Sequence, residues 1–228
     1  MSPRARRQQR TSQAILDAAR QIIQREGIDA LSMRALAERI DYSPASLYEY
    51  YGSKDEIIQA VCEQGHGLMR DRMAQVDKTL DVVDYLVQIG LVYIHFAVTN
   101  PDYFRIMFAV LDGNMPDPGA ADGPEANTEA NTEASTEASK EARPLLAPPP
   151  PDSSFYILLG AIQRGIDEGV YRVQPEIGLL EMAYGAWSLV HGLATLRIAH
   201  DSRFPVDYTQ TEPAILRAYA AGLGQKDK

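Results

Sequence analysis

Apolar residues recur at helical spacing along the first sixty residues and predict a run of short helices. The first covers residues 11–26 and ends at Gly27, where a helix C-terminus favours a residue with positive φ. The second follows Ser32 and lasts about two turns. The third runs over residues 45–51, with Ser43 as its N-cap. Three short helices with a sharp connection between the last two indicate a helix-turn-helix, whose third helix enters the DNA major groove.

The pattern after residue 52 predicts a longer, more apolar set of helices. A capping box of Ser53 and Glu56 begins the fourth helix. A broad apolar face predicts a long buried helix over residues 81–99, and a short, very apolar helix continues to residue 111. Further helices are expected at residues 153–169, 176–200 and 212–223. The predicted fold class is all-α, with a three-helix head followed by a helical bundle.

Residues 112–152 differ from the rest of the chain. They contain a four-residue repeat built on Thr-Glu-Ala, and a polyproline run follows it. Because this segment has too little apolar surface to offset the entropy of ordering, we expect a flexible insert. A transient helix of period four is the alternative. No functional site is assigned to the insert.

Charge is distributed unevenly. The chain carries a net charge of -9, but residues 1–57 have nine basic and eight acidic residues, so the acidity lies in the C-terminal part. The first ten residues contain four arginines and no acidic residue. They are expected to form a basic flexible arm that either contacts DNA or only aids solubility. These arginines are Arg4, Arg6, Arg7 and Arg10.

Several classes of protein are disfavoured. A lone cysteine, Cys62, allows no intramolecular disulfide. It is expected to pack as an apolar residue on the fourth helix. No signal core follows the basic N-terminus, and the uncharged stretch 182–196 is too short to span a bilayer, so we expect a cytoplasmic protein without membrane contact. The sequence has no catalytic motif and no ligand-like histidine spacing. We therefore expect no enzyme activity, no metal and no cofactor.

The head resembles the DNA-binding domain of the tetracycline-repressor (TetR) family. The resemblance rests on residues 14–19 (AILDAA), 31–37 (LSMRALA), 43–51 (SPASLYEYY) and 53–56 (SKDE). Asp41 stands where the family usually has glycine in the turn, and Tyr51 stands where phenylalanine is commoner. Asp tolerates the left-handed conformation better than most residues, so we expect the turn to form.

The resemblance implies a set of DNA-contacting residues. Tyr48 and Lys54 are expected to bind phosphates, and Arg34 either reaches a phosphate or pairs with Glu38. The predicted helix offers no Arg, Asn or Gln, so no operator sequence can be derived. The remaining positions are Ser32 and Ser43, for capping and phosphate contact, and Ala45, Ser46 and Tyr50, facing the groove.

A second resemblance, in residues 101–108 (PDYFRIMF) and 187–194 (WSLVHGLA), is to the C-terminal domain of a TetR subgroup with a Trp/His-Gly signature. It implies an effector pocket, mostly apolar with few polar groups, although the same residues also suit an ordinary core. The effector is expected to be hydrophobic or aromatic, oriented by His191 and a tyrosine hydroxyl. The candidate lining residues are Tyr85, Ile89, Tyr93, Phe96, Phe104, Met107, Phe108, Phe155, Leu159, Trp187 and His191.

The sequence thus predicts a transcriptional regulator with an arm at residues 1–10, a DNA-binding domain at 11–53 and a ligand-binding and dimerisation domain at 54–228. The expected partners are double-stranded operator DNA, a small effector and a second copy of the chain. Repression is the family's usual mode. The alternatives are an activator or ligand-independent regulator, and a small-molecule-binding protein or enzyme that has lost DNA binding.

Overall fold

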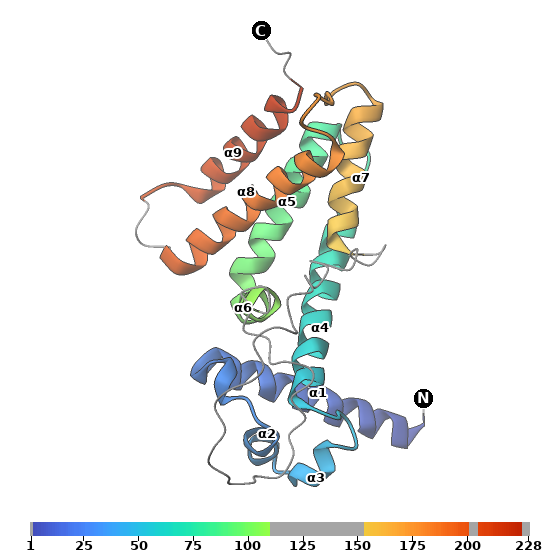
Figure 1. Cartoon of the computed structure of the whole chain (residues 1–228), viewed down its shortest axis with the longest axis vertical. Helices are drawn as coiled ribbons and strands as arrows, with labels where there is room; N and C mark the ends of the chain where they lie inside the picture. Colours follow the sequence, from blue (N-terminus) through green and yellow to red (C-terminus); the bar gives the residue numbers. More distant parts are fainter. Residues whose placement is uncertain (1, 110–152, 201–204, 225–228) are drawn as a thin grey trace, which may run out of the picture.

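The structure is a computed structural model that describes residues 2–109, 153–200 and 205–224, and this part of the chain is helical (Figure 1). The predicted insert at 112–152 lies outside the described residues. A short 3-10 turn, Ile28–Ala30, follows the first helix. The α-helices are α1 (Pro3–Glu26), α2 (Met33–Ile40), α3 (Pro44–Leu47), α4 (Lys54–Ala74), α5 (Val82–Thr99), α6 (Pro101–Ala109), α7 (Ser154–Asp167), α8 (Leu179–His200) and α9 (Tyr208–Gly222).

The head contains α1, α2 and α3, and it packs on the lower part of α4 (Figure 1). Its core is formed by Ile15, Leu36 and Leu47, all of which are fully buried. Gly27 has φ +89°, as expected for the residue that ends α1. Asp41 adopts the left-handed conformation (φ 59°, ψ 47°) after α2, so the prediction for this turn is confirmed.

The predicted boundaries of α1 and α3 need correction. Helix α1 begins at Pro3 rather than residue 11, because Ser2 caps it and Pro3 occupies its first turn. The residues assigned to a flexible arm therefore form its first two turns. Helix α3 ends at Leu47 rather than residue 51, and the Leu47 carbonyl accepts from both the Tyr50 amide at 2.9 Å and the Tyr51 amide at 3.0 Å in the turn that follows.

Helix α4 connects the head to the body and rises along one side of the molecule (Figure 1). Its capping box forms: the Ser53 hydroxyl accepts from the Glu56 amide at 3.2 Å, and the Glu56 carboxylate accepts from the Gly52 amide at 2.7 Å. Near its middle, Gly65 allows close packing on α6. A Cβ added at Gly65 would lie 2.4 Å from the Met107 sulfur.

The body is organised around α5, which contacts α4, α6, α7, α8 and α9. Among the described helices, α5 alone is long and apolar enough to cross a membrane, but 56% of it is buried, as in the core helix of a globular domain. Helix α9 starts at Tyr208, earlier than the predicted residue 212, because Asp207 caps it. Glu212 is consequently inside the helix, buried, and bound by Arg197 of α8 at 3.0 Å.

Candidate DNA interface and effector site

Ser32 and Ser43, two of the predicted DNA-contacting residues, are the N-caps of α2 and α3. The Ser32 hydroxyl accepts from the Ala35 amide at 3.1 Å, and the Ser43 hydroxyl accepts from the Ser46 amide at 3.2 Å. Ser43 and Ser46 also share a hydroxyl contact of 2.7 Å. Ser32 and Ser43 are both exposed, so capping leaves them accessible to a phosphate.

The other predicted head residues fall into an exposed and a half-buried group. Tyr48 is 52% exposed directly after α3, and Ala45 is exposed on its first turn. Ser46, Tyr50 and Lys54 are half-buried, with Lys54 at the first position of α4. The α3 surface and the start of α4 therefore present hydroxyl, phenol and ammonium groups on neighbouring segments.

Arg34 forms the intrahelical pair that its spacing allows. Its Nε lies 3.0 Å from Glu38 Oε1, and the two side chains are 84% and 68% exposed. A pair this exposed contributes little to stability, so Arg34 can exchange Glu38 for a phosphate at small cost.

Leu47 and Tyr51 hold α3 to the head. Leu47 is fully buried, and the Tyr51 hydroxyl lies 2.7 Å from the Ser12 hydroxyl on α1. Tyr42, just after the turn at Asp41, similarly lies 3.2 Å from the Thr11 hydroxyl. These contacts fix the orientation of α3 relative to α1.

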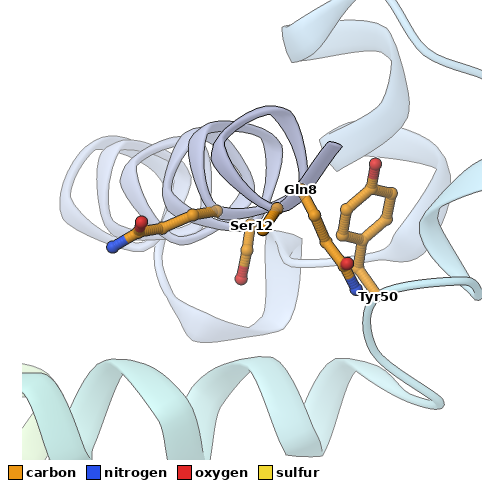
Figure 2. Close-up of a pocket in the computed structure, with 5 residues that line it drawn as sticks. Gln8, Ser12 and Tyr50 are labelled. Carbon is orange, nitrogen blue, oxygen red and sulfur yellow. The ribbon is translucent and has the colours of Figure 1, made fainter. Parts of the chain in front are cut away.

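An open pocket of about 340 Å³ separates the start of α1 from the segment after α3. Figure 2 shows Gln8 and Ser12 on one side and Tyr50 on the other, with the Gln8 side chain extending toward Tyr50. Ala5 and Gln9 complete the lining. All of the lining side chains are uncharged, and those of Gln8, Gln9, Ser12 and Tyr50 carry hydrogen-bonding groups.

In the body, five of the predicted effector-site residues form one cluster of rings. Phe108 lies at the centre, with ring centroids 4.8 Å from Phe104 and 4.6 Å from His191. Tyr93 contacts the cluster from α5, and Trp187 contacts it from α8. We call these residues, Tyr93, Phe104, Phe108, Trp187 and His191, the ring cluster.

Tyr93 and His191 give the ring cluster its polar centre. The Tyr93 hydroxyl and His191 Nδ1 are 2.9 Å apart, and burial raises the pKa of Tyr93 well above its ordinary value. The neighbouring Trp187 side chain opposes that rise in pKa. Either Tyr93 or His191 donates in this contact, according to the tautomer of the imidazole.

The remaining predicted effector-site residues lie elsewhere. Phe96 is fully buried and lies beneath the Arg72 guanidinium, 5.4 Å from its ring centroid. Met107 packs on α4 at Gly65. No ring contact joins Phe155 or Tyr85 to the ring cluster in the described part of the chain. These two, together with Ile89 and Leu159, contribute to the general core.

Sequence reasoning missed a polar junction between the head and the body. Arg20 of α1 donates through Nε to Asp102 of α6 at 2.8 Å, and its Cζ lies 3.9 Å from the centre of the Tyr103 ring. The Tyr103 hydroxyl donates to Gln64 of α4 at 3.1 Å, and Gln64 donates to Gln13 of α1 at 2.9 Å. We call this set the junction. Its members have no shared local pattern, although Pro101-Asp102 was visible as a helix start.

His66 was also missed as a neighbour of the ring cluster. It is exposed on α4, and its ring meets Phe108 edge-on with centroids 6.4 Å apart. Its place between Gly65 and Gly67, four residues after Cys62, was the available signal.

Among the described residues, neither Cys62 nor the acidic side chains form a reactive or metal-binding group. The Cys62 thiol lies 3.8 Å from the Ile106 carbonyl, and burial raises its pKa to about 11. No group of three or more His, Cys, Asp or Glu side chains in the described residues is placed to hold a metal ion.

Comparison with known families agrees with this architecture at both ends of the chain. Residues 15–61 match the model "Bacterial regulatory proteins, tetR family". Residues 86–219 match "Tetracyclin repressor-like, C-terminal domain", which covers more than half of the chain. The Trp/His-Gly subgroup stays a prediction.

The chain spans about half the length of the curated relatives that it matches. It is 34% identical over 80 residues to the HTH-type transcriptional regulator UidR of Escherichia coli K12, covering 35% of this chain and 41% of UidR. It is 29% identical over 95 residues to the uncharacterized HTH-type transcriptional regulator YobS of Bacillus subtilis, covering 42% of this chain and 50% of YobS.

Solved structures share the fold over nearly the whole chain. A TetR-family regulatory protein from Rhodococcus superposes with a TM-score of 0.65 at 15% identity, covering 95% of this chain and 98% of its own. The TetR-family regulator PfmR from Thermus thermophilus gives 0.57 at 16% identity, covering 92% and 96%. Given both family matches, the head geometry and the shared fold, the chain belongs to the TetR family of helix-turn-helix transcriptional regulators.

Proposed function

We propose that the protein is a cytoplasmic repressor that binds operator DNA as a homodimer and releases it when a small hydrophobic or aromatic effector binds. The observation that carries this proposal is the double attachment of α6. Phe104 and Phe108 place one side of α6 in the ring cluster, and Asp102 and Tyr103 attach it to Arg20 in the junction. A change in the ring cluster therefore reaches the head through the nine-residue helix α6.

The DNA surface of the proposal consists of α3 and the starts of α2 and α4. Tyr48 and Lys54 contact phosphates, as do Arg34 and the capping serines Ser32 and Ser43. Ala45, Ser46 and Tyr50 face the groove. Because the exposed residues of α3 are small or hydroxylic, shape and backbone contacts contribute much of the affinity.

The effector site of the proposal is the ring cluster. Its five side chains provide aromatic surface, and Tyr93 and His191 provide the polar pair that orients a ligand. An effector inserted among the rings displaces Phe104 and Phe108, and with them α6. Since α6 packs on α4 at Gly65 and binds α1 through Arg20, the head moves relative to the body. Recognition helices that no longer match successive major grooves lose affinity.

The dimer surface of the proposal is the outer face of α8 and α9. Leu180 and Tyr184, one turn apart on α8, are 61% and 66% exposed, and Ile215 on α9 is 36% exposed. Two such helices from each protomer suit a four-helix bundle. Tyr184→Glu places a charge at the most exposed of these positions and is expected to give monomers by light scattering. A dimer of unchanged stability refutes this surface.

The test of DNA binding is fluorescence anisotropy on the DNA upstream of the protein's own coding region, across a salt series. Specific binding that weakens with salt and is lost in Tyr48→Ala, Lys54→Ala supports the proposal. The matched control is Tyr156→Ala, Lys78→Ala, which removes an exposed tyrosine and lysine from the body. Equal binding by the first variant and the control, or binding no tighter than to unrelated DNA, contradicts it.

The single tryptophan gives a direct readout of the effector site. Trp187 belongs to the ring cluster, and the chain contains no other tryptophan, so its fluorescence reports ligand entry. A ligand that changes Trp187 emission and weakens operator binding over the same concentration range supports release. A ligand that changes emission with DNA affinity unaltered contradicts the coupling.

A further inference from the structure

The first eight residues of α1, Pro3 to Arg10, form a cationic helical extension. Arg4, Arg6, Arg7 and Arg10 are all exposed, and none has an ion-pair partner among the described residues. The first acidic residue of the chain is Asp17. An exposed cluster of one sign, in a chain whose net charge is -9, marks a localised site for an anionic partner.

The helical form of this extension is electrostatically unfavourable in the isolated protein. Helix N-termini carry partial positive charge, so guanidinium groups in the first turns are repelled. Arg6 and Arg10 are four residues apart, and Arg7 is three from both Arg4 and Arg10, so the arginines also repel one another. Ser2 as N-cap and Pro3 in the first turn begin the helix nevertheless. A polyanion bound along the extension removes both repulsions.

The extension faces the segment that follows α3 across an open pocket. The pocket of about 340 Å³ lies between them, lined by Gln8, Gln9 and Ser12 of α1 and by Tyr50 after α3 (Figure 2). The hydroxyl and amide groups of this pocket can donate hydrogen bonds to phosphate oxygens. The eight residues span about 12 Å, a length over which duplex DNA carries about seven phosphates.

We propose that the arginine extension of α1 is a second DNA contact, which binds backbone phosphates beside the half-site that α3 occupies. This inference rests on the proposed DNA-binding function and adds a partner surface to it. The occupant is the phosphate backbone of duplex DNA, because the cations lie on the helix that lines a pocket with Tyr50, just after α3, and the polar side chains of that pocket are neutral donors. Base sequence is not read here, so the extension adds affinity for flanking DNA of any sequence.

The test compares two operator duplexes, one ending at the outer edges of the half-sites and one extended by about five base pairs at each end. The wild-type protein is expected to bind the extended duplex at least about tenfold more tightly in low salt. Log K falls as log salt rises, and each phosphate contact makes this slope steeper by about 0.9, so eight arginines per dimer make it steeper by up to about 7. We expect the slope for the extended duplex to be steeper than that for the short duplex by at least about 2.

The test variant replaces all four extension arginines by glutamine, which keeps helix propensity. It is expected to bind both duplexes equally and to lose the additional salt slope. A control with the same change in net charge places glutamine at four exposed basic positions elsewhere. It is expected to keep the tighter binding to the extended duplex, which we call the flank gain. These positions are Arg25, Lys78, Arg105 and Arg172.

The outcomes separate this inference from the proposed function. A flank gain and salt slope that survive in the four-arginine variant overturn the extension as a DNA contact, and the cluster then serves only solubility. Loss of the gain in the control as well overturns it, because net charge alone then explains the effect. Wild-type protein that binds neither duplex overturns both proposals.

Hydrogen exchange gives an independent readout. Amides of residues 6–12 are expected to exchange more slowly on the extended duplex than on the short one, because DNA stabilises the repelled helix. Amides around α3 are protected by both duplexes. Unchanged exchange at residues 6–12 on the extended duplex overturns the inference.

Discussion

Arg20 on α1 binds Asp102 at the start of α6, across 82 residues of sequence. The side chains of Asp102 and Arg20 are 12% and 25% exposed. Burial lowers the pKa of Arg20, but the hydrogen bond and charge of Asp102, together with Tyr103 and Asp17, outweigh it and raise that pKa. Asp102 also lies in the first turn of α6, where an acidic residue is favourable to the helix. The same carboxylate therefore stabilises α6 and attaches it to the head.

A double-mutant cycle on Arg20→Ala and Asp102→Ala is expected to give a coupling energy of about 1–2 kcal/mol in urea unfolding. The cycle subtracts the effect of Asp102 on its own helix and leaves the interhelical pair. The control is the pair Arg39 and Glu26, 3.0 Å apart with side chains 32% and 52% exposed, for which we expect less than about 1 kcal/mol. A coupling no larger than this control would show that the junction is weak.

The head could be predicted from its sequence because its signals are local. Ser32, Ser43 and Ser53 each accept from the amide three residues later, as their positions before apolar stripes indicated. The start of α1 was missed because residues 3–10 have no apolar stripe, and arginines at a helix N-terminus argue against a helix. Ser2 and Pro3 were the correct local signals.

The candidate effector site was only partly predictable. The aromatic stripes correctly identified helices that meet, and five of the residues named do form the ring cluster. Periodicity alone does not say which turn of α5 faces which turn of α8, so the sequence did not separate the ring cluster from Phe96, which packs beneath Arg72. The junction was invisible because Arg20 and Asp102 come together only through the tertiary fold.

Two glycines two residues apart on α4 are expected to respond to alanine in opposite directions. Gly65→Ala meets the Met107 sulfur at 2.4 Å and the Tyr103 ring at 3.1 Å, so we expect a loss of about 1–3 kcal/mol. At Gly67 the nearest atom is an Arg70 nitrogen at 3.8 Å, so alanine is expected to stabilise the helix by about 0.5–1 kcal/mol. Urea unfolding measures both. Equal effects at the two positions would exclude close packing of α4 on α6.

Cys62 is expected to react slowly with thiol reagents in the folded protein. Burial raises its pKa to about 11, so at pH 8.5 the thiolate fraction is roughly 100-fold below that of a thiol with a pKa of 9. The rate of labelling by iodoacetamide is compared in buffer and in urea. Since a raised thiol pKa disfavours the thiolate in the fold, labelling accelerates with pH up to about 11. Comparable rates in buffer and urea would mean that Cys62 is not packed against α6.

The ring cluster is expected to prefer an uncharged aromatic ligand. None of its five residues is Asp, Glu, Lys or Arg, so a carboxylate entering it loses hydration with no permanently charged partner in the cluster. We expect cinnamyl alcohol to bind at least about tenfold more tightly than cinnamate, measured by the emission of Trp187. Tyr93→Phe removes the hydroxyl that contacts His191 and is expected to weaken the alcohol with little effect on the acid. Tighter binding of cinnamate would require a cationic group to reach the ligand, and would assign the effector to a different chemical class.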